Sequence, residues 1–246
     1  MDKFTELFPE DLTFEKKSRT KKAKKIVAVL EDYFGDLSDL SCLDLGCSVG
    51  HISAYLAKHF RKVSGVDVDD VAIKTAIKIH KSKNLSFKMS AENKIPFAGG
   101  TFNVVVFNQI YEHVESPSRL FEEIDRVLKK GGVCFFGARN KYFIMDGHYP
   151  IPFLAILPRG IADFIAKILF SKEKYDINLI SLKNLKQLTS GFLVRDYTLA
   201  AIKNPHKFMA EDVVPTTLGI NYFLLVLAKA FYAFVPNYLW VLIKKS

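Results

Sequence analysis

The chain is poor in cysteine, with only Cys42, Cys47 and Cys134 among its 246 residues. These three do not have the close, paired spacing of a zinc site, and they are too few and too scattered for a disulfide framework. Each is expected in a strand or beside a glycine turn. We therefore interpret the chain as a reduced, cytoplasmic protein that has neither structural zinc nor disulfides.

Two other features are missing. The N-terminal stretch MDKFTELFPEDLTF lacks the basic and then apolar pattern of a secretory signal. The chain also lacks an excess of acid, because 35 Lys and Arg residues against 26 Asp and Glu residues give a formal net charge of +9. Such a charge favours an anionic partner, whether nucleic acid, a phosphorylated substrate or an anionic membrane, although a lysine-rich surface can also be merely solvated.

A basic run, FEKKSRTKKAKK at 14–25, leads into an expected amphipathic helix that Gly35 ends. The apolar face of this helix holds Ala23, Ile26, Val27, Leu30 and Phe34. One interpretation is a helix that packs on the domain with its lysines in water. The other is a helix that flanks the active site and attracts an anionic group.

Strands and helices are expected to alternate between residues 41 and 140. The expected strands lie at about 41–46, 62–68, 85–89, 102–109 and 133–138, and the helices at about 50–60, 69–82 and 117–130. The fourth strand, FNVVVFNQ, is nearly all apolar, as central parallel strands buried on both faces are. The alternation predicts a doubly wound parallel sheet whose ligands bind beyond the carboxyl ends of its strands.

The second half of the chain is expected to complete one α/β domain over residues 1–246. The full prediction is a Rossmann-like, seven-stranded, mostly parallel sheet with helices on both faces and a helical insertion after strand five. The insertion includes a helix over about 171–190 that ends at Gly191, and further strands are expected at 192–202 and 237–245. The expected parts are a basic helical cap (1–40), a core of alternating strands and helices (41–140), a helical insertion (141–190) and C-terminal strands with an apolar helix (191–246).

The most apolar window, TTLGINYFLLVLAKAFYAFV at 216–235, is long enough to span a bilayer. Lys229 and Asn221 interrupt it, however. Three interpretations stay open: a membrane span, a helix lying at a membrane interface, and a helix docked on the domain before the last strand.

The stretch SCLDLGCSVG at 41–50 has the order strand, glycine turn, helix. Gly46 lets the chain leave the strand, Gly50 lets the helix approach closely, and the open amides can meet a carboxylate or phosphate. The third glycine of a dinucleotide fingerprint is missing, and so is the Gly-Lys-Ser/Thr of a phosphate loop. The turn alone therefore does not choose its ligand.

Asp67, at the end of the second expected strand, lies seventeen residues after Gly50. A carboxylate at this position can accept both hydroxyls of a ribose. A strand-end aspartate can instead cap the next helix, but Asp69 and Asp70 are better placed for capping. We therefore favour the ribose role for Asp67.

Four segments together resemble the class I S-adenosylmethionine-dependent methyltransferases, most of all the branch with ubiquinone- and menaquinone-biosynthesis methyltransferases. They are LDLGCSVG, GVDVDD, SAENKIPFAGGTFNVVVFNQIYEHV and LFEEIDRVLKKGG. The resemblance covers about 40–140. HYPIPFLAILPRG, in the later segment, is similar to a helical insertion found in some members. The resemblance implies that 41–140 is the cofactor-binding core and that the insertion at 141–190 is a substrate lid.

The resemblance implies S-adenosylmethionine as cofactor and assigns its contacts. Asp44, Gly46, Cys47, Ser48 and Gly50 would hold the methionine portion, Asp67 the ribose, Val68 the adenine face, and Ser90, Ala91 and Glu92 the adenine edge, while Asn108 would lie by the amino group and the methyl. The family's middle turn glycine is Ser48 here, and its adenine-reading acid is Ser90, so Glu92 or a water would substitute. Members that use a metal have an acid at the position of Gln109, so no metal is expected.

His113 is the candidate general base, since a neutral imidazole can take a proton from an attacking hydroxyl or amine. The alternative is a helix-start histidine that only packs and hydrogen-bonds locally. Asn108 is the second candidate catalytic residue. The candidates for the substrate pocket are Tyr111, Asn140, Tyr142, His148 and Tyr149, of which those in the insertion are equally plausible as packing residues.

The leading hypothesis is direct, in-line methyl transfer to a small-molecule or lipid-like acceptor, with peripheral membrane contact through the basic helix or the apolar segments. An RNA methyltransferase is the first alternative, prompted by the charge. The fourth strand ends in Asn-Gln-Ile-Tyr and not Asn-Pro-Pro-Tyr, which disfavours nucleic acid. A non-catalytic S-adenosylmethionine-binding protein, prompted by Ser48 and Ser90, is the second alternative, and the oligomeric state stays open.

Overall fold

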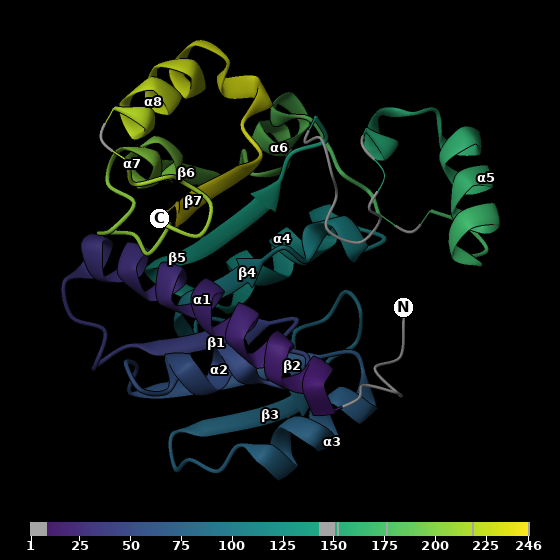
Figure 1. The fold of residues 1–246 in the computed structure, drawn as a ribbon. Coiled ribbons are helices and arrows are strands. Elements are labelled where there is room, and N and C mark those ends of the chain that lie inside the picture. The colour runs from purple at the N-terminus through teal and green to yellow at the C-terminus, as the bar shows by residue number, and fades with distance from the viewer. Residues whose placement is uncertain (1–8, 143–150, 152, 176, 218, 246) are drawn as a thin grey trace.

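A computed structural model describes residues 9–142, 151, 153–175, 177–217 and 219–245 (Figure 1). Its centre is a single seven-stranded sheet in the order β3-β2-β1-β4-β5-β7-β6. The strands are β1 Ser41–Leu45, β2 Lys62–Asp67, β3 Leu85–Met89, β4 Phe102–Asn108, β5 Leu128–Arg139, β6 Phe192–Asp196 and β7 Asn237–Lys244. The first five strands are parallel, and β7 runs antiparallel to both β5 and β6. The predicted mostly parallel, doubly wound sheet is confirmed.

Helices cover both faces of this sheet (Figure 1). They are α1 Pro9–Phe34, α2 His51–Leu56, α3 Asp70–Ile79, α4 Pro117–Val127, α5 Arg159–Phe170, α6 Leu182–Leu188, α7 Thr198–Lys203 and α8 Ile220–Ala230, with short 3-10 turns η1 Tyr111–His113, η2 Leu154–Ile156 and η3 Tyr232–Phe234. In Figure 1, α1 crosses in front of the strands, whereas α5 stands out to one side of the domain.

Alternation along the central strands divides the core in two. Cys42 of β1 packs with Ile26 and Leu30 of α1, while its neighbour Leu43 packs on the opposite face with Leu120 of α4. Successive strand residues point to opposite faces, so a strand covered on both sides must be apolar throughout. This explains why β1 is buried at all five positions.

Three predicted boundaries are wrong. The helix expected over about 171–190 is helical only at Leu182–Leu188, because Tyr175, Ile177 and Leu179 are buried at every second position, which is the period of extended chain. The strand expected at 192–202 ends at Asp196, whose carboxylate accepts the amide of Thr198 at 2.8 Å and so starts α7. β5 begins at Leu128, earlier than 133, because α4 ends at Val127.

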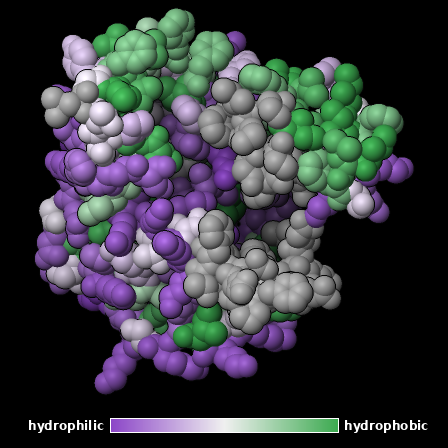
Figure 2. All heavy atoms as spheres, viewed as in Figure 1, coloured by the Kyte–Doolittle hydropathy of each residue, from purple (hydrophilic) through white to green (hydrophobic). Residues whose placement is uncertain are grey.

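The apolar window at 216–235 contains α8, which is eleven residues long. Among the described residues, no helix has both the length and the apolar character that crossing a bilayer requires. Leu225 and Ala228 bury one side of α8, while Tyr222 and Phe223 are exposed on the other. Figure 2 shows apolar side chains gathered over α8 and again over α5. The helix is therefore docked on the domain with an apolar face left in solvent.

Asn140, immediately after β5, ties the end of this strand to the segment before β7. Its side-chain Nδ2 donates to the carbonyls of Ala233 and Val235, both at 2.8 Å, and to Tyr238 Oη at 3.0 Å. The side chain is fully buried. It therefore supplies a donor to the buried carbonyl of Val235 and shares the carbonyl of Ala233 with Tyr238 Oη.

Replacing Asn140 by Ala is expected to lower the free energy of unfolding by about 2–3 kcal/mol, because a buried acceptor is left without a donor. Chemical denaturation followed by circular dichroism measures this. Exposed Asn204→Ala is the control and should change stability by less than about 0.5 kcal/mol. Equal stability of the two variants would show that the Asn140 bonds contribute nothing.

Candidate active site

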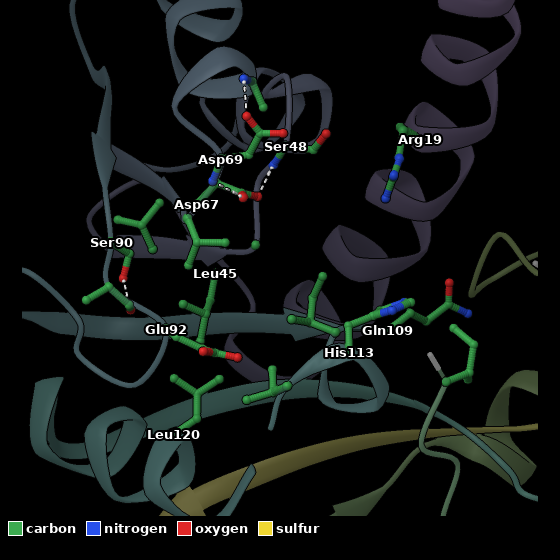
Figure 3. Close-up of a pocket in the computed structure, with 18 of the residues that line it drawn as sticks. Arg19, Leu45, Ser48, Asp67, Asp69, Ser90, Glu92, Gln109, His113 and Leu120 are labelled. Atoms are coloured by element: carbon green, nitrogen blue, oxygen red, sulfur yellow. Dashed lines mark hydrogen bonds between the residues drawn. The ribbon is translucent and has the colours of Figure 1, made fainter. Parts of the chain in front are cut away.

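A cavity of about 550 Å³ opens at the carboxyl ends of β1, β2 and β4 (Figure 3). Its walls come from α1, the glycine turn after β1, the end of β2, the loop after β3 and the segment after β4. The volume lies within the range of small-molecule sites. The position is the one that a doubly wound sheet offers to ligands.

The glycine turn shapes one wall of the cavity. Gly46 and Gly50 have positive φ angles of 73° and 81°. A Cβ at Gly46 would lie 2.6 Å from the Ile110 side chain, and one at Gly50 would lie 2.6 Å from the Phe87 ring. Neither position can therefore hold another residue without a shift of its neighbours. These two glycines are fixed both by conformation and by space.

Ser48, at the middle of the turn, also has a positive φ, of 50°. This conformation is unfavourable for a residue with a Cβ, which explains why a glycine suits the position better. The buried Ser48 Oγ has no hydrogen-bond partner among the described residues, and Ser48 lines the cavity. An unpaired buried hydroxyl at a cavity wall is well placed for a bound ligand.

Asp67 joins the turn to the end of β2. Its Oδ2 accepts the backbone amide of Ser48 at 2.7 Å and its Oδ1 accepts that of Asp69 at 3.0 Å, as Figure 3 shows. Each carboxylate oxygen keeps further acceptor capacity for a ligand hydroxyl. Asp69 caps α3 by accepting the amides of Val71 and Ala72, so the predicted capping role of Asp69 is confirmed.

Most of the predicted cofactor residues meet in this cavity. The ones that line it are Gly46, Ser48, Asp67, Val68, Ser90, Ala91 and Glu92, and the candidate base His113 lines it too. Ser90 Oγ donates to the carbonyls of Ala91 and Lys94, so its hydroxyl shapes the loop after β3.

Three predicted residues do not line the cavity: Asp44, which lies in β1 below the turn, and Cys47 and Gly50, which belong to the turn itself. Asp44 Oδ2 accepts from Ser53 Oγ at 2.5 Å, which anchors the start of α2. Burial raises the pKa of the Asp44 carboxyl to about 6, against the opposing effect of the Ser53 bond. Burial likewise raises the pKa of the Cys47 thiol. These groups support the turn from within.

Asn108, predicted to lie by the amino group and the methyl, is not among the residues that line the cavity at the glycine turn. It lies next to Gly137 across the β4–β5 pair, and a Cβ at Gly137 would fall 2.0 Å from Asn108 Oδ1. The carboxamide therefore fills the space that a side chain at 137 would take. It lines a second cavity, together with Phe135 of the same sheet face, and not the cavity at the glycine turn.

The predicted substrate residues are also redistributed. Tyr111 and Asn140 are buried in the core, where Tyr111 Oη donates to the carbonyl of Arg139 at 2.6 Å. Tyr142 packs against the ring of Phe234. None of these three residues lines the cavity at the turn. His148 and Tyr149 lie outside the described residues.

Three cations, Arg19, Lys22 and Arg139, also line the cavity. Arg139 was expected there from its place at the end of the fifth strand, whereas Arg19 and Lys22 were considered only as part of the basic run 14–25. Lys22 Nζ donates to Gln109 Oε1 at 2.6 Å, a contact between residues 87 positions apart. Burial, with Arg19 and Arg139 nearby, lowers the pKa of Lys22 to about 8. The available signal was the i, i+3 spacing of Arg19 and Lys22, which puts both on one side of α1 beside its apolar face.

Glu112 supplies a buried acid next to these cations. It is 0% exposed, and neither carboxylate oxygen has a hydrogen-bond partner among the described side chains and backbone. Burial raises its pKa to about 7, with Arg139 and Lys22 opposing the shift. Of the two interpretations of the N-terminal helix, the geometry favours the one that places it beside the active site.

The Glu112 proton makes stability depend on pH. The folded chain keeps this proton to about pH 7, whereas an ordinary glutamate loses it near 4.5. The unfolded state therefore binds fewer protons in this window, and stability falls as the pH rises through it. Glu112→Gln removes this titration. Between pH 5 and pH 8, the free energy of unfolding of the unchanged protein should therefore fall by about 2 kcal/mol more than that of Glu112→Gln.

Denaturant unfolding at both pH values measures this difference. Glu122→Gln, on an exposed position of α4, controls for the loss of one carboxylate. An identical pH slope for Glu112→Gln and the unchanged protein would contradict a shifted pKa at Glu112.

The cavity can be tested for fit to S-adenosylmethionine. The Asp67 carboxylate suits two ribose hydroxyls, Val68 and Ala91 offer an adenine its apolar surroundings, and the unpaired Ser48 hydroxyl suits the polar methionine end. Most amides of the turn, which were expected to be open, donate instead within the protein, to the Val66 carbonyl, to Asp67 and to the Cys47 carbonyl. The cations of α1 complement a carboxylate. The residues present therefore fit this cofactor.

Comparison with known proteins agrees with the geometry. Residues 43–136 match the model of a methyltransferase domain family. A ubiquinone biosynthesis O-methyltransferase of Nitrosomonas europaea is 28% identical over 145 residues, which cover 55% of this chain and 60% of that enzyme. The enzyme of the same name from Acinetobacter baylyi is 25% identical over 185 residues, covering 70% of this chain and 76% of that enzyme.

Solved structures show the same fold. A protein of Pyrococcus horikoshii superimposes with a TM-score of 0.59 at 19% identity, over 92% of this chain and 91% of that one. An S-adenosylmethionine-dependent methyltransferase of Mesorhizobium loti gives 0.58 at 17% identity, over 88% and 96%. These matches show that the chain shares the fold of these structures, and that its residues 43–136, which include the glycine turn, Asp67 and the loop after β3, are similar to a methyltransferase domain.

Proposed function

We propose that this protein transfers a methyl group from S-adenosylmethionine to a small, lipid-like acceptor. The observation that carries the proposal is the convergence of the Gly46–Gly50 turn, Asp67 and the Ser90–Glu92 loop on one cavity. The match of residues 43–136 to a methyltransferase domain supports it. The names of the relatives from Nitrosomonas and Acinetobacter support an acceptor of quinone-like character.

The proposed roles of the cofactor residues follow from their chemistry. Asp67 would accept the ribose hydroxyls, Val68 and Ala91 would pack against the adenine, and Arg19 would face the carboxylate. When bound, S-adenosylmethionine supplies a methyl group activated by a sulfonium. The positive charges of α1 would attract the carboxylate of the ligand and so hold that end at the basic side of the cavity.

The remaining wall residues would prepare the acceptor. Ile110, Val114 and Leu120 form an apolar surface that excludes water from the reacting atoms. His113 lies on the same wall, where an imidazole can take the proton that an attacking hydroxyl releases. Most of the rate would come from holding acceptor and donor in line.

Methyl-labelled S-adenosylmethionine, incubated with the purified protein and a fractionated cell extract, tests the acceptor class. Label is expected in the organic-solvent fraction, and His113→Ala should slow its incorporation by about 10²- to 10⁴-fold if the imidazole acts as base. Label confined to RNA would favour the RNA methyltransferase alternative. Cofactor binding without label in any fraction would favour a non-catalytic protein.

We also propose that the protein meets a membrane surface through α5 and α8. Phe164, Ile168 and Leu169 of α5 are each more than half exposed, as are Tyr222 and Phe223 of α8. Figure 2 shows these helices as two apolar areas on the upper part of the molecule. Exposed apolar side chains on amphipathic helices, in a chain of net charge +9, suit an anionic bilayer.

Sedimentation with vesicles of phosphatidylcholine and phosphatidylglycerol tests the contact. The protein should sediment with them, and Phe164→Ser with Leu169→Ser should lower the bound fraction at least about fivefold, since each exposed side chain contributes apolar area. Ile77→Ser, which removes an exposed apolar side chain from α3, is the matched control. Binding unchanged by the α5 substitutions would remove that helix from the interface.

A further inference from the structure

A second cavity of about 470 Å³ lies between α1, α7, α8 and the sheet face that they cover. Its lining is largely apolar and includes Ile26, Phe135, Ala201, Leu224, Ala228 and Leu239. The methyltransfer site described above does not use it. The cavity opens to solvent at the exposed side chains of Val213, Phe231 and Phe234, so a ligand can enter it from outside.

Some polar groups of this cavity have partners and others do not. Lys25 and Asp212 pair with each other at 3.2 Å, so their charges are compensated. Asn237 Oδ1 is buried and has no hydrogen-bond partner among the described residues. An unpaired acceptor in an otherwise apolar cavity is costly unless a ligand donates to it.

The two cavities share a wall. Lys22 and Gln109 line both of them, and the 2.6 Å hydrogen bond between Lys22 Nζ and Gln109 Oε1 forms the boundary. Asn108 lies next to Gln109 on the side of the second cavity. Polar side chains therefore gather where the apolar space meets the cofactor cavity, as they would around the head of an amphiphile whose tail is buried.

We propose that the second cavity holds the apolar chain of the methyl acceptor, whose hydroxylated head reaches past the Lys22–Gln109 pair toward the cofactor cavity. This inference rests on the proposed function and names the acceptor class more closely: a hydroxyl-bearing head on an aliphatic chain. The wall that the two cavities share at Lys22 and Gln109 argues for this occupant. The Lys22 ammonium would donate a hydrogen bond to the head's oxygen, whose proton passes to the proposed base His113 as the oxygen accepts the methyl group, and Asn108 and Gln109 would orient the head.

The position of Asn108 has a reason in this arrangement. Gly137, beside it on β5, leaves the space that the Asn108 carboxamide takes up. The amide therefore reaches over the sheet face toward the second cavity. A head group passing between the cavities would meet Asn108 before it meets Gln109.

Titration calorimetry with 4-alkylphenols carrying chains of one to eight carbons tests the chain site without any cofactor. Each methylene that leaves water should tighten binding by up to about fourfold, and the octyl compound should bind at least about 100-fold more tightly than the methyl compound. Affinity that does not change with chain length would overturn the proposal.

Two neighbouring residues of α8 give a matched pair of variants. Leu224 lines the cavity, whereas Phe223 is exposed and does not. Leu224→Trp should fill the space and abolish the chain-length dependence, and Phe223→Trp should preserve it. Leu227→Trp, at another lining position, repeats the test if Leu224→Trp does not fold. Unchanged binding in a folded, cavity-filled variant would overturn the chain site.

A parallel titration with S-adenosylmethionine separates the two claims. Cofactor binding with a flat alkylphenol series overturns the chain site and leaves the proposed function in place. A steep series that Leu224→Trp abolishes, in a protein that does not bind the cofactor, supports the chain site and overturns methyl transfer. Both results positive support both.

Discussion

The hydrogen bond from the Ser48 amide to Asp67 Oδ2, at 2.7 Å, connects the two halves of the cofactor cavity. It holds a turn in which Gly46, Ser48 and Gly50 all have positive φ. A left-handed conformation costs about 1–2 kcal/mol at a residue with a Cβ, so Ser48 needs a compensating contact. Asp67 supplies that contact and still faces the cavity with acceptor capacity. The wall of the site depends on this one carboxylate.

Several ionisable side chains are buried near this turn. Lys22, Glu112 and Arg139 lie near one another at the end of the cavity, and burial lowers the pKa of Lys22 and raises that of Glu112. Both shifts favour the neutral form of the buried group, because an isolated buried charge is costly. The cluster links α1 to the segment after β4 through the bond from Lys22 to Gln109. The helix that begins the chain is thus part of both cavities.

Local patterns in the sequence predict the sheet and the glycine turn, because strand, turn and helix signals act over neighbouring residues. The turn, Asp67 and the loop at Ala91 follow from strand ends meeting at one edge. The contact between Lys22 and Gln109 could not be predicted, since it joins residues 87 positions apart. Nor could the face taken by Asn108, which depends on the absent side chain of Gly137 across the strand pair. The segment 171–181 was misjudged because its buried residues alternate as in a strand, without pairing in the sheet.

The central claim is that S-adenosylmethionine binds between the glycine turn and Asp67. Isothermal titration of the purified chain with S-adenosylmethionine, beside Asp67→Asn, tests it most directly. The account predicts a single site that Asp67→Asn weakens at least about tenfold, because a charged acceptor of the ribose hydroxyls becomes a neutral amide. Absence of binding at millimolar cofactor, or equal affinity in the two proteins, would contradict it.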